Sequence, residues 1–190
     1  SYQAINTMNS FSTIGIFSKR EGKAVEATLR TLHQFLTERG VKILASRAPA
    51  KILQLTETDE HQIAQQADLA IVVGGDGTLL NAGRLLSTYN LPIVGVNLGR
   101  LGFLVDVSPD DMTSQLTEIL QGQYHEEQRC LLHAEVYREE QTLGAGTALN
   151  DIVLHSRNEI RMIEFTTCID GSFVTTQRAD GIVVATPTGS

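Results

Sequence analysis

Residues 71–80, IVVGGDGTLL, decide how the rest of this chain is interpreted. The apolar run at residues 69–73 is typical of a strand that is buried on both faces of a parallel sheet. The glycine-rich segment 74–78, GGDGT, follows directly and precedes a helical pattern. Glycines permit positive φ and close approach of the backbone to a ligand, and the N–H groups at the start of the next helix point to the same place. This segment therefore suits a phosphate, and its central Asp76 indicates a role with a proton or a metal ion.

The segment 74–78 also has a purely structural interpretation. Glycine-rich turns between strand and helix are common in α/β proteins, and Asp-Gly is an ordinary turn dipeptide. The P-loop pattern is excluded because no Gly-Lys-Ser/Thr follows, and G-x-G-x-x-G is excluded because Leu80 occupies the third glycine position. Both interpretations stay open on these residues alone.

Composition narrows the class of protein. The chain has 190 residues, 42% hydrophobic and 19% charged, so it is long enough to bury a core and looks globular and soluble. A formal net charge of -7 without any basic run argues against nucleic acid as a partner. No apolar stretch approaches the roughly 20 residues that cross a bilayer, and no signal-peptide pattern opens the chain. Cys130 and Cys168 are isolated thiols, which favours a reducing cytoplasm.

The first part of the chain alternates strand and helix patterns, which predicts an α/β domain with a mostly parallel sheet over residues 9–125. Residues 1–7 are interpreted as a cloning remnant in front of Met8. Gly40 is placed to end the first helix in the left-handed conformation. The expected strands are 11–17, 41–45, 69–73 and 93–96, and the expected helices are 23–39, 58–67, 79–86 and 108–122.

A second glycine-containing loop, residues 97–103, follows the strand at 93–96. In an open α/β sheet this loop is expected at the same edge as segment 74–78. Ligands bind beyond the carboxyl ends of such strands, so the second loop strengthens the hypothesis of a site.

The pattern changes after about Tyr124, and residues 126–190 read as the start of an all-β domain that is incomplete. Asp170-Gly171 is a hairpin dipeptide, and residues 138–146 and 156–161 read as connections. A crevice between the two domains is the natural ligand site. The expected strands are 130–137, 148–155, 163–169, 173–177 and 182–185.

The remaining polar residues carry little signal one by one. Asn150-Asp151 reads first as a strand edge or bulge, and Asp180-Gly181 reads first as a turn. Ser190 has no histidine or aspartate partner that the sequence identifies, so nucleophilic catalysis is unsupported. The five histidines show no metal-ligand spacing and are interpreted as structural or surface residues: His33, His61, His125, His133 and His155.

Four motifs in series resemble those of the NAD kinases. They are GGDGT at 74–78, N-x-G-x-x-G-F at 97–103, the pair Asn150-Asp151, and DG-x-x-x-x-TPTGS at 180–190. The first motif alone is weak, because diacylglycerol and sphingoid lipid kinases carry it and phosphofructokinases have a related loop. The order and intervals of all four make the resemblance specific.

The resemblance implies an N-terminal α/β domain, a C-terminal β-sandwich domain and a site between them. It implies a kinase that phosphorylates the 2′-hydroxyl of the adenosine ribose of NAD, with ATP or polyphosphate as donor and Mg²⁺ or another divalent cation. It further implies a cytoplasmic homodimer or homotetramer that associates through the β domain, without a membrane partner. No metal-ligating residue is assigned.

The resemblance also assigns roles to particular residues. Asp76 matches the aspartate that acts as base or orients the 2′-hydroxyl, and it also contacts NAD together with Gly77. The residues that match the phosphate-binding loop are Gly74, Gly75, Gly77 and Thr78. The residues that match NAD-binding positions beyond the loop are Phe103, Asn150, Asp151, Asp180, Thr186, Thr188 and Ser190.

One departure from the pattern concerns the last motif, which in the family continues past the serine that is Ser190 here. We therefore expect the chain to lack strands that complete the site, which leaves its own catalytic competence open. Two other functions compete with an NAD kinase: a lipid kinase, whose apolar acceptor site gives no reason for Asn150-Asp151, and a dinucleotide-binding fragment without catalysis.

Overall fold

The computed structural model describes residues 11–19, 22–98, 104, 107–156 and 162–190. The chain divides into two compact units, Ser1–Glu127 and Gln128–Ser190, and each is considered by itself. The predicted boundary between residues 125 and 126 remains a prediction. None of the described helices is long and apolar enough to cross a membrane.

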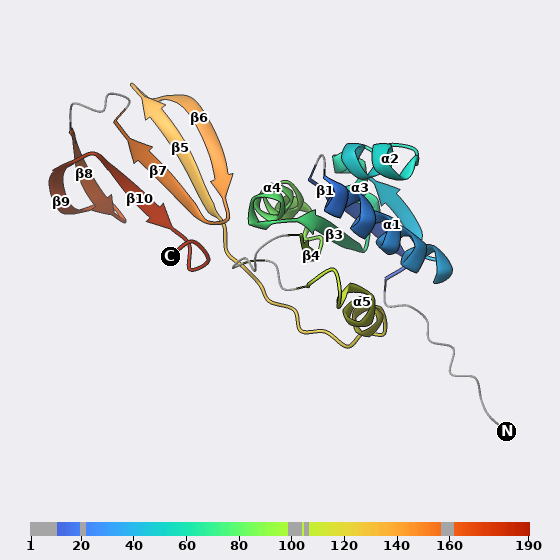
Figure 1. Ribbon diagram of the computed structural model, residues 1–190. Helices are drawn as coiled ribbons and strands as arrows, with labels where there is room; N and C mark the ends of the chain where they lie inside the picture. The colour runs from blue at the N-terminus through green and yellow to red at the C-terminus, as the bar shows by residue number, and fades with distance from the viewer. Residues whose placement is uncertain (1–10, 20–21, 99–103, 105–106, 157–161) are drawn as a thin grey trace. The chain divides into compact units, whose positions relative to one another are not determined.

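A four-stranded, fully parallel sheet forms the centre of the first unit (Figure 1). Its strand order is β2-β1-β3-β4, with β3 in an interior position. This confirms the predicted α/β domain with a parallel sheet. The strands are β1 Thr13–Ser18, β2 Lys42–Ala45, β3 Leu69–Gly74 and β4 Ile93–Asn97.

Helices cover both faces of this sheet, as the unbroken apolar character of β3 predicts. Alternate side chains of β3 enter different clusters, because successive residues of a strand point to opposite faces. Ile71 and Val73 pack with residues of α1 and α5, whereas Ala70 and Val72 pack with residues of α3 and α4. The helices are α1 Lys23–Glu38, α2 Arg47–Leu53, α3 Glu60–Gln66, α4 Asp76–Leu86, the 3₁₀ turn η1 Ser87–Tyr89 and α5 Met112–Leu120.

Local sequence signals explain two of the helix ends. The φ of Gly40 is 67°, so this glycine takes the left-handed conformation expected after α1. The carboxylate of Asp59 accepts hydrogen bonds from the backbone N–H groups of His61 and Gln62 and so caps α3. Helix α2 was not expected, since its short sequence contains Pro49. That proline lies in the first turn, where a missing N–H costs no helical hydrogen bond.

The described part of the second unit consists of three two-stranded antiparallel sheets, which confirms the expected change to an all-β domain. Hairpin β8–β9 turns at Asp170 and Gly171, whose φ values are 50° and 78°, as the dipeptide predicts. The strands are β5 Leu132–Arg138, β6 Gln141–Ala148, β7 Asp151–His155, β8 Ile163–Ile169, β9 Ser172–Ala179 and β10 Gly181–Ala185.

The expected connection at 138–146 is wrong, because most of it belongs to β6, which begins at Gln141. The chain reverses at Glu139 and Glu140, which both have positive φ, at 48° and 65°. A two-residue hairpin requires this geometry, but glutamate is a poor residue for it, so the sequence carries no turn signal there.

The two units differ in burial. The apolar core lies in the first unit, and Thr186 is the one residue of the second unit, within its described part, that is buried. The second unit instead exposes many large apolar side chains. These are Val136, Tyr137, Leu143, Val153, Leu154, Met162, Ile169, Phe173, Val174, Val183 and Val184.

Candidate functional site

The carboxyl ends of β3 and β4 form one edge of the first unit's sheet. Gly74 and Asn97 are register partners at the ends of these two strands. The backbone N–H of Leu98 donates to the carbonyl of Gly74 at 3.1 Å. Both glycine-containing loops therefore begin side by side, as predicted. Residues 99–103, which include the predicted site residue Phe103, lie outside the described residues.

The sequence predicted a helix that begins after the glycine-rich segment, at residue 79. Helix α4 instead begins inside this segment. Its first residue is Asp76, and Gly75 occupies the cap position without a capping side chain. The backbone N–H groups of Thr78 and Leu79 both donate to the carbonyl of Gly75, at 3.0 Å and 3.1 Å. The Asp76 carboxylate thus lies in the first turn, where the positive end of the helix favours a negative charge.

A hydrogen bond links Asp76 to the second loop. Its Oδ1 accepts from the backbone N–H of Leu104 at 3.3 Å, and the Asp76 side chain is partly buried. The contact holds the carboxylate between the start of α4 and the chain that follows β4. A carboxylate fixed in this way can orient or deprotonate a hydroxyl that binds beside it.

The glycines of segment 74–78 serve different purposes. A Cβ at Gly74 would lie 2.5 Å from Oγ1 and 2.7 Å from Cβ of Thr78, so the side chain of Thr78 occupies the space beside Gly74. A Cβ at Gly75 or Gly77 would meet no atom of the described residues within 4 Å. The expected use of positive φ is wrong for all three glycines, because none has a φ in the left-handed region.

Lys19 is a polar residue at this edge that the sequence interpretation missed. It directly follows β1, which has β2 on one side and β3 on the other, so that the strand order switches direction beside β1. Its backbone N–H donates to the carbonyl of Val73 at 3.1 Å, which places Lys19 next to the start of the glycine-rich segment. A lysine immediately after the first apolar strand was the available signal. Such a switch in strand order marks the usual ligand crevice of an open α/β sheet.

Two of the predicted motifs meet within the second unit. Strand β10 pairs with β7, so that Ala185 is the register partner of Asp151. The backbone N–H of Thr186 donates to the carbonyl of Asn150 at 2.7 Å. The Asn-Asp pair and the start of the TPTGS segment are therefore neighbours, although Asp151 and Thr186 are 35 positions apart in the sequence.

Asn150 has a polar atom that the fold leaves unused. Its Oδ1 is buried and has no hydrogen-bond partner among the described residues. A buried acceptor without a partner costs free energy, so it calls for a donor from outside the described chain. Asp151, by contrast, is exposed at the start of β7.

The other predicted residues of the second unit occupy different settings. Asp180 is exposed, and its carbonyl accepts from the backbone N–H of Ser156 at 2.9 Å. The hydroxyl of Thr188 accepts from Arg129 at 3.2 Å. Ser190 is exposed, whereas Thr186 is buried and its hydroxyl bonds within the fold. The structure therefore brings together Asn150, Thr186 and Thr188 but gives Thr186 an internal role.

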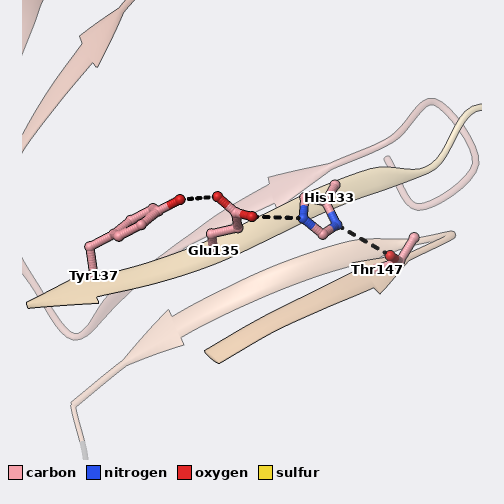
Figure 2. A network of polar contacts seen from close by, with 4 residues as sticks. All are labelled: His133, Glu135, Tyr137 and Thr147. Atoms are coloured by element: carbon pink, nitrogen blue, oxygen red, sulfur yellow. Dashed lines mark hydrogen bonds and ion pairs between the residues drawn. The ribbon is translucent and has the colours of Figure 1, made fainter. Parts of the chain in front are cut away.

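A network of polar side chains on the β5–β6 hairpin has no assigned role (Figure 2). Glu135 accepts from the Tyr137 hydroxyl and contacts Nε2 of His133 at 3.4 Å. The other ring nitrogen of His133 lies 3.5 Å from the hydroxyl of Thr147. The hydrogen bond from Tyr137, and then the contact with His133, hold the pKa of the Glu135 carboxyl below its usual value. All these contacts are exposed, so they stabilise the hairpin only weakly.

Clusters of histidine, cysteine, aspartate and glutamate side chains are the usual protein ligands of metal ions. Over the described ranges, no group of three or more such side chains could hold a metal ion. The described residues therefore do not form a cation site from three or more such side chains.

Comparison with known families decides the relationship of this chain to other proteins. A family model of the ATP-NAD kinase N-terminal domain matches residues 14–124, which is more than half of the chain. The chain belongs to the ATP-NAD kinase family. A model of the ATP-NAD kinase C-terminal domain matches residues 149–190, so both units have counterparts in the family.

Individual members of the ATP-NAD kinase family are similar over nearly the whole chain. The NAD kinase of Pseudomonas entomophila (strain L48) is 45% identical over 186 residues, which cover 96% of this chain and 63% of that protein. The NAD kinase of Aeromonas salmonicida (strain A449) is 47% identical over 183 residues, covering 95% of this chain and 62% of that protein. The chain thus spans less than two thirds of the length of these curated relatives.

Solved structures show the same fold. The crystal structure of yeast NADH kinase complexed with NADH superimposes with a TM-score of 0.83 at 24% identity, over 95% of this chain and 59% of that one. The crystal structure of an NAD kinase from Archaeoglobus fulgidus in complex with ATP gives a TM-score of 0.70 at 25% identity, over 93% of this chain and 61% of that one.

Proposed function

We propose that the protein is a kinase that transfers a phosphoryl group from ATP to the 2′-hydroxyl of the adenosine ribose of NAD and so makes NADP. Membership of the ATP-NAD kinase family supports this proposal, as do relatives named NAD kinase at 45% and 47% identity. One observation carries it in the structure itself. The start of α4 combines an anchored carboxylate, Asp76, with glycines at positions 75 and 77 that the described packing does not require.

Those two glycines point to a ligand. A residue without a side chain costs conformational entropy on folding, and Gly77 lies within a helix, where alanine is more favourable by about 1 kcal/mol. A Cβ there would meet no described atom, which supports the proposal of a ligand that binds against the backbone. Exposed N–H groups at a helix start suit a phosphate of the donor.

Asp76 supplies the chemistry on the acceptor side in this proposal. Its carboxylate accepts a hydrogen bond from the 2′-hydroxyl, orients the oxygen toward the terminal phosphorus of ATP and takes the proton late in the transfer. A carboxylate is a weak base toward an alcohol, so orientation contributes more than basicity. The bond between the 2′-oxygen and the terminal phosphorus forms as the bond from that phosphorus to the leaving ADP breaks, with the two oxygens in line.

We propose that a divalent cation binds to the phosphates of ATP rather than to a site made of protein side chains alone. Magnesium is commonly held by one or two carboxylates together with substrate phosphates, and Asp76 is a carboxylate at this edge. We therefore expect Mg²⁺ to arrive with ATP, where it neutralises charge on the phosphates. The described part of the chain offers no larger donor set.

The second unit is proposed to hold NAD. The unpartnered Oδ1 of Asn150 is an acceptor for a hydroxyl or amide of the dinucleotide, and the exposed carboxylates of Asp151 and Asp180 suit ribose hydroxyls. Phe103 is proposed to lie at the adenine. In our proposal these residues bind the dinucleotide, and the glycine-rich segment binds the donor phosphate.

Two broader features complete the proposal. Cys130 and Cys168 are both exposed and unbonded thiols, which favours the cytoplasm. The exposed apolar side chains of the second unit favour a homodimer or homotetramer that associates through this unit.

The proposal is tested with an acceptor panel on the full-length gene product. NAD, NADH and a diacylglycerol are each offered with ATP and Mg²⁺, and with polyphosphate as a second donor, and product is quantified by mass. We expect phosphorylation of a dinucleotide. Phosphorylation of the diacylglycerol alone would support a lipid kinase, and NAD binding without product would support a non-catalytic dinucleotide-binding protein.

A further inference from the structure

Hydrogen bonds of Thr186 join the segment TPTGS to residues 149–150, which directly precede β7. This residue is only 2% exposed, in a unit whose other described residues are at least partly exposed. Its Oγ1 donates to the carbonyl of Leu149 at 2.5 Å and lies 3.1 Å from the carbonyl of Asn150. The Thr186 backbone N–H also donates to the Asn150 carbonyl.

The same hydroxyl organises the turn that follows. Oγ1 of Thr186 accepts from the backbone N–H of Thr188 at 3.2 Å and from that of Gly189 at 3.3 Å. The Gly189 N–H is also 3.1 Å from the carbonyl of Thr186. One buried hydroxyl therefore donates to the segment between β6 and β7 and accepts from the turn that follows β10, which uses its full hydrogen-bonding capacity.

Gly189 completes the contact from the other side. A Cβ on Gly189 would lie 2.6 Å from C and 2.8 Å from Cα of Asn150, and closer still to the Asn150 carbonyl oxygen. Only a residue without a side chain fits, because the obstacle is backbone that cannot rotate away. The turn thus packs directly on the backbone of Asn150.

The geometry points to Thr186 as a positioning residue that fixes Asn150 for NAD, rather than as a residue that touches NAD. This inference rests on the proposed function, in which Asn150 binds the dinucleotide. The polar groups of Thr186 are turned to Leu149, Asn150, Thr188 and Gly189, so they orient the backbone that carries the unpartnered Oδ1 of Asn150. The residue acts before the substrate arrives, by preorganising the site.

Steady-state kinetics of the full-length protein test this role. Thr186→Val keeps the shape of the side chain but removes the hydroxyl, so we expect the KM for NAD to rise by about tenfold or more while the KM for ATP stays within about twofold. Thr186→Ser keeps the hydroxyl and should restore the KM for NAD to within about twofold of the wild type. The matched control is Thr166→Val, since the Thr166 hydroxyl bonds that of Thr176 at 2.9 Å on the exposed β8–β9 hairpin.

The outcomes separate the two proposals. A wild-type protein that makes no NADP overturns the proposed function and this role with it. If the wild type makes NADP but Thr186→Val leaves the KM for NAD unchanged, or raises both KM values equally, only the positioning role is overturned. If Thr186→Val does not fold, Thr186→Cys replaces it, because a thiol is only a weak donor and a weak acceptor, and an unchanged KM for NAD in that variant overturns the role.

Discussion

Replacing Gly74 with alanine tests the claim that close packing, rather than positive φ, requires a glycine at the end of β3. The new Cβ would lie 2.5 Å from Oγ1, 2.7 Å from Cβ and 3.0 Å from Cγ2 of Thr78. Rotation of the Thr78 side chain leaves its Cβ in place, so the start of α4 must move relative to β3. Because Gly74 is buried, we expect a loss of about 1–3 kcal/mol in the free energy of unfolding, the usual cost of overpacking.

Urea unfolding followed by circular dichroism measures this loss, and two neighbouring glycines provide matched controls. Gly75→Ala and Gly77→Ala add the same methyl group where no described atom lies within 4 Å. We expect their free energies of unfolding to stay within about 0.5 kcal/mol of the wild type or, at Gly77 in the helix, to rise by up to about 1 kcal/mol. Both controls should still lose kinase activity, because the added methyl group occupies the space proposed for a phosphate.

A double-mutant cycle separates this contact from other effects of the methyl group. Thr78→Ala removes Oγ1 and Cγ2 but keeps the Cβ, so it should relieve part of the cost of Gly74→Ala, with a coupling of about 0.5 kcal/mol or more. If Gly74→Ala unfolds at the same urea concentration as Gly75→Ala, or if the cycle shows no coupling, the packing argument is refuted.

Three further predictions concern single side chains. Asp76→Asn should lower kcat for NADP formation by about 10²-fold or more and change the KM for NAD little, since the carboxylate acts on the reacting hydroxyl; near-normal turnover would contradict its role. Asn150→Ala should mainly raise the KM for NAD, and an unchanged KM would return Asn150 to a structural role. The Asp68 carboxyl accepts hydrogen bonds from the Ser12 hydroxyl and from the backbone N–H groups of Thr13 and Ser12. These bonds, that of the Ser12 hydroxyl first, hold the pKa of Asp68 below its usual value. The stabilisation by Asp68 is therefore present above the ordinary aspartate pKa and is lost as pH falls through the lowered value; Asp68→Asn should flatten this acid dependence of the free energy of unfolding, and an unaltered dependence would exclude the contact as its source.

The parts of the fold that the sequence predicts well are those with local causes. The apolar run of β3 predicts a strand that is buried on both faces. Gly40 marks the end of α1, Asp59 caps α3, and Asp170-Gly171 forms the turn of the β8–β9 hairpin. Strand β6 was missed because its turn at residues 139–140 lacks the glycine or asparagine that normally allows positive φ. Pairing with β5 imposes that turn, and a local sequence signal does not report such a tertiary effect.

The candidate site shows the same division between local and long-range information. Segment 74–78 identifies a strand-to-helix turn with a carboxylate, and register brings Gly74 beside Asn97 as expected for neighbouring parallel strands. The sequence could not reveal that Thr78 packs against Gly74, nor that Thr186 bonds Leu149 and Asn150 instead of facing solvent. These contacts depend on side-chain placement across elements, which residue type alone does not determine.

The most direct test of the central claim is to identify the product that the full-length protein makes from NAD, ATP labelled at the terminal phosphate, and Mg²⁺. We predict that the label appears on the 2′-oxygen of the adenosine ribose, as NADP that an NADP-specific dehydrogenase reduces. Label that stays on ATP, appears as free phosphate alone, or is found on another oxygen of NAD would contradict the account.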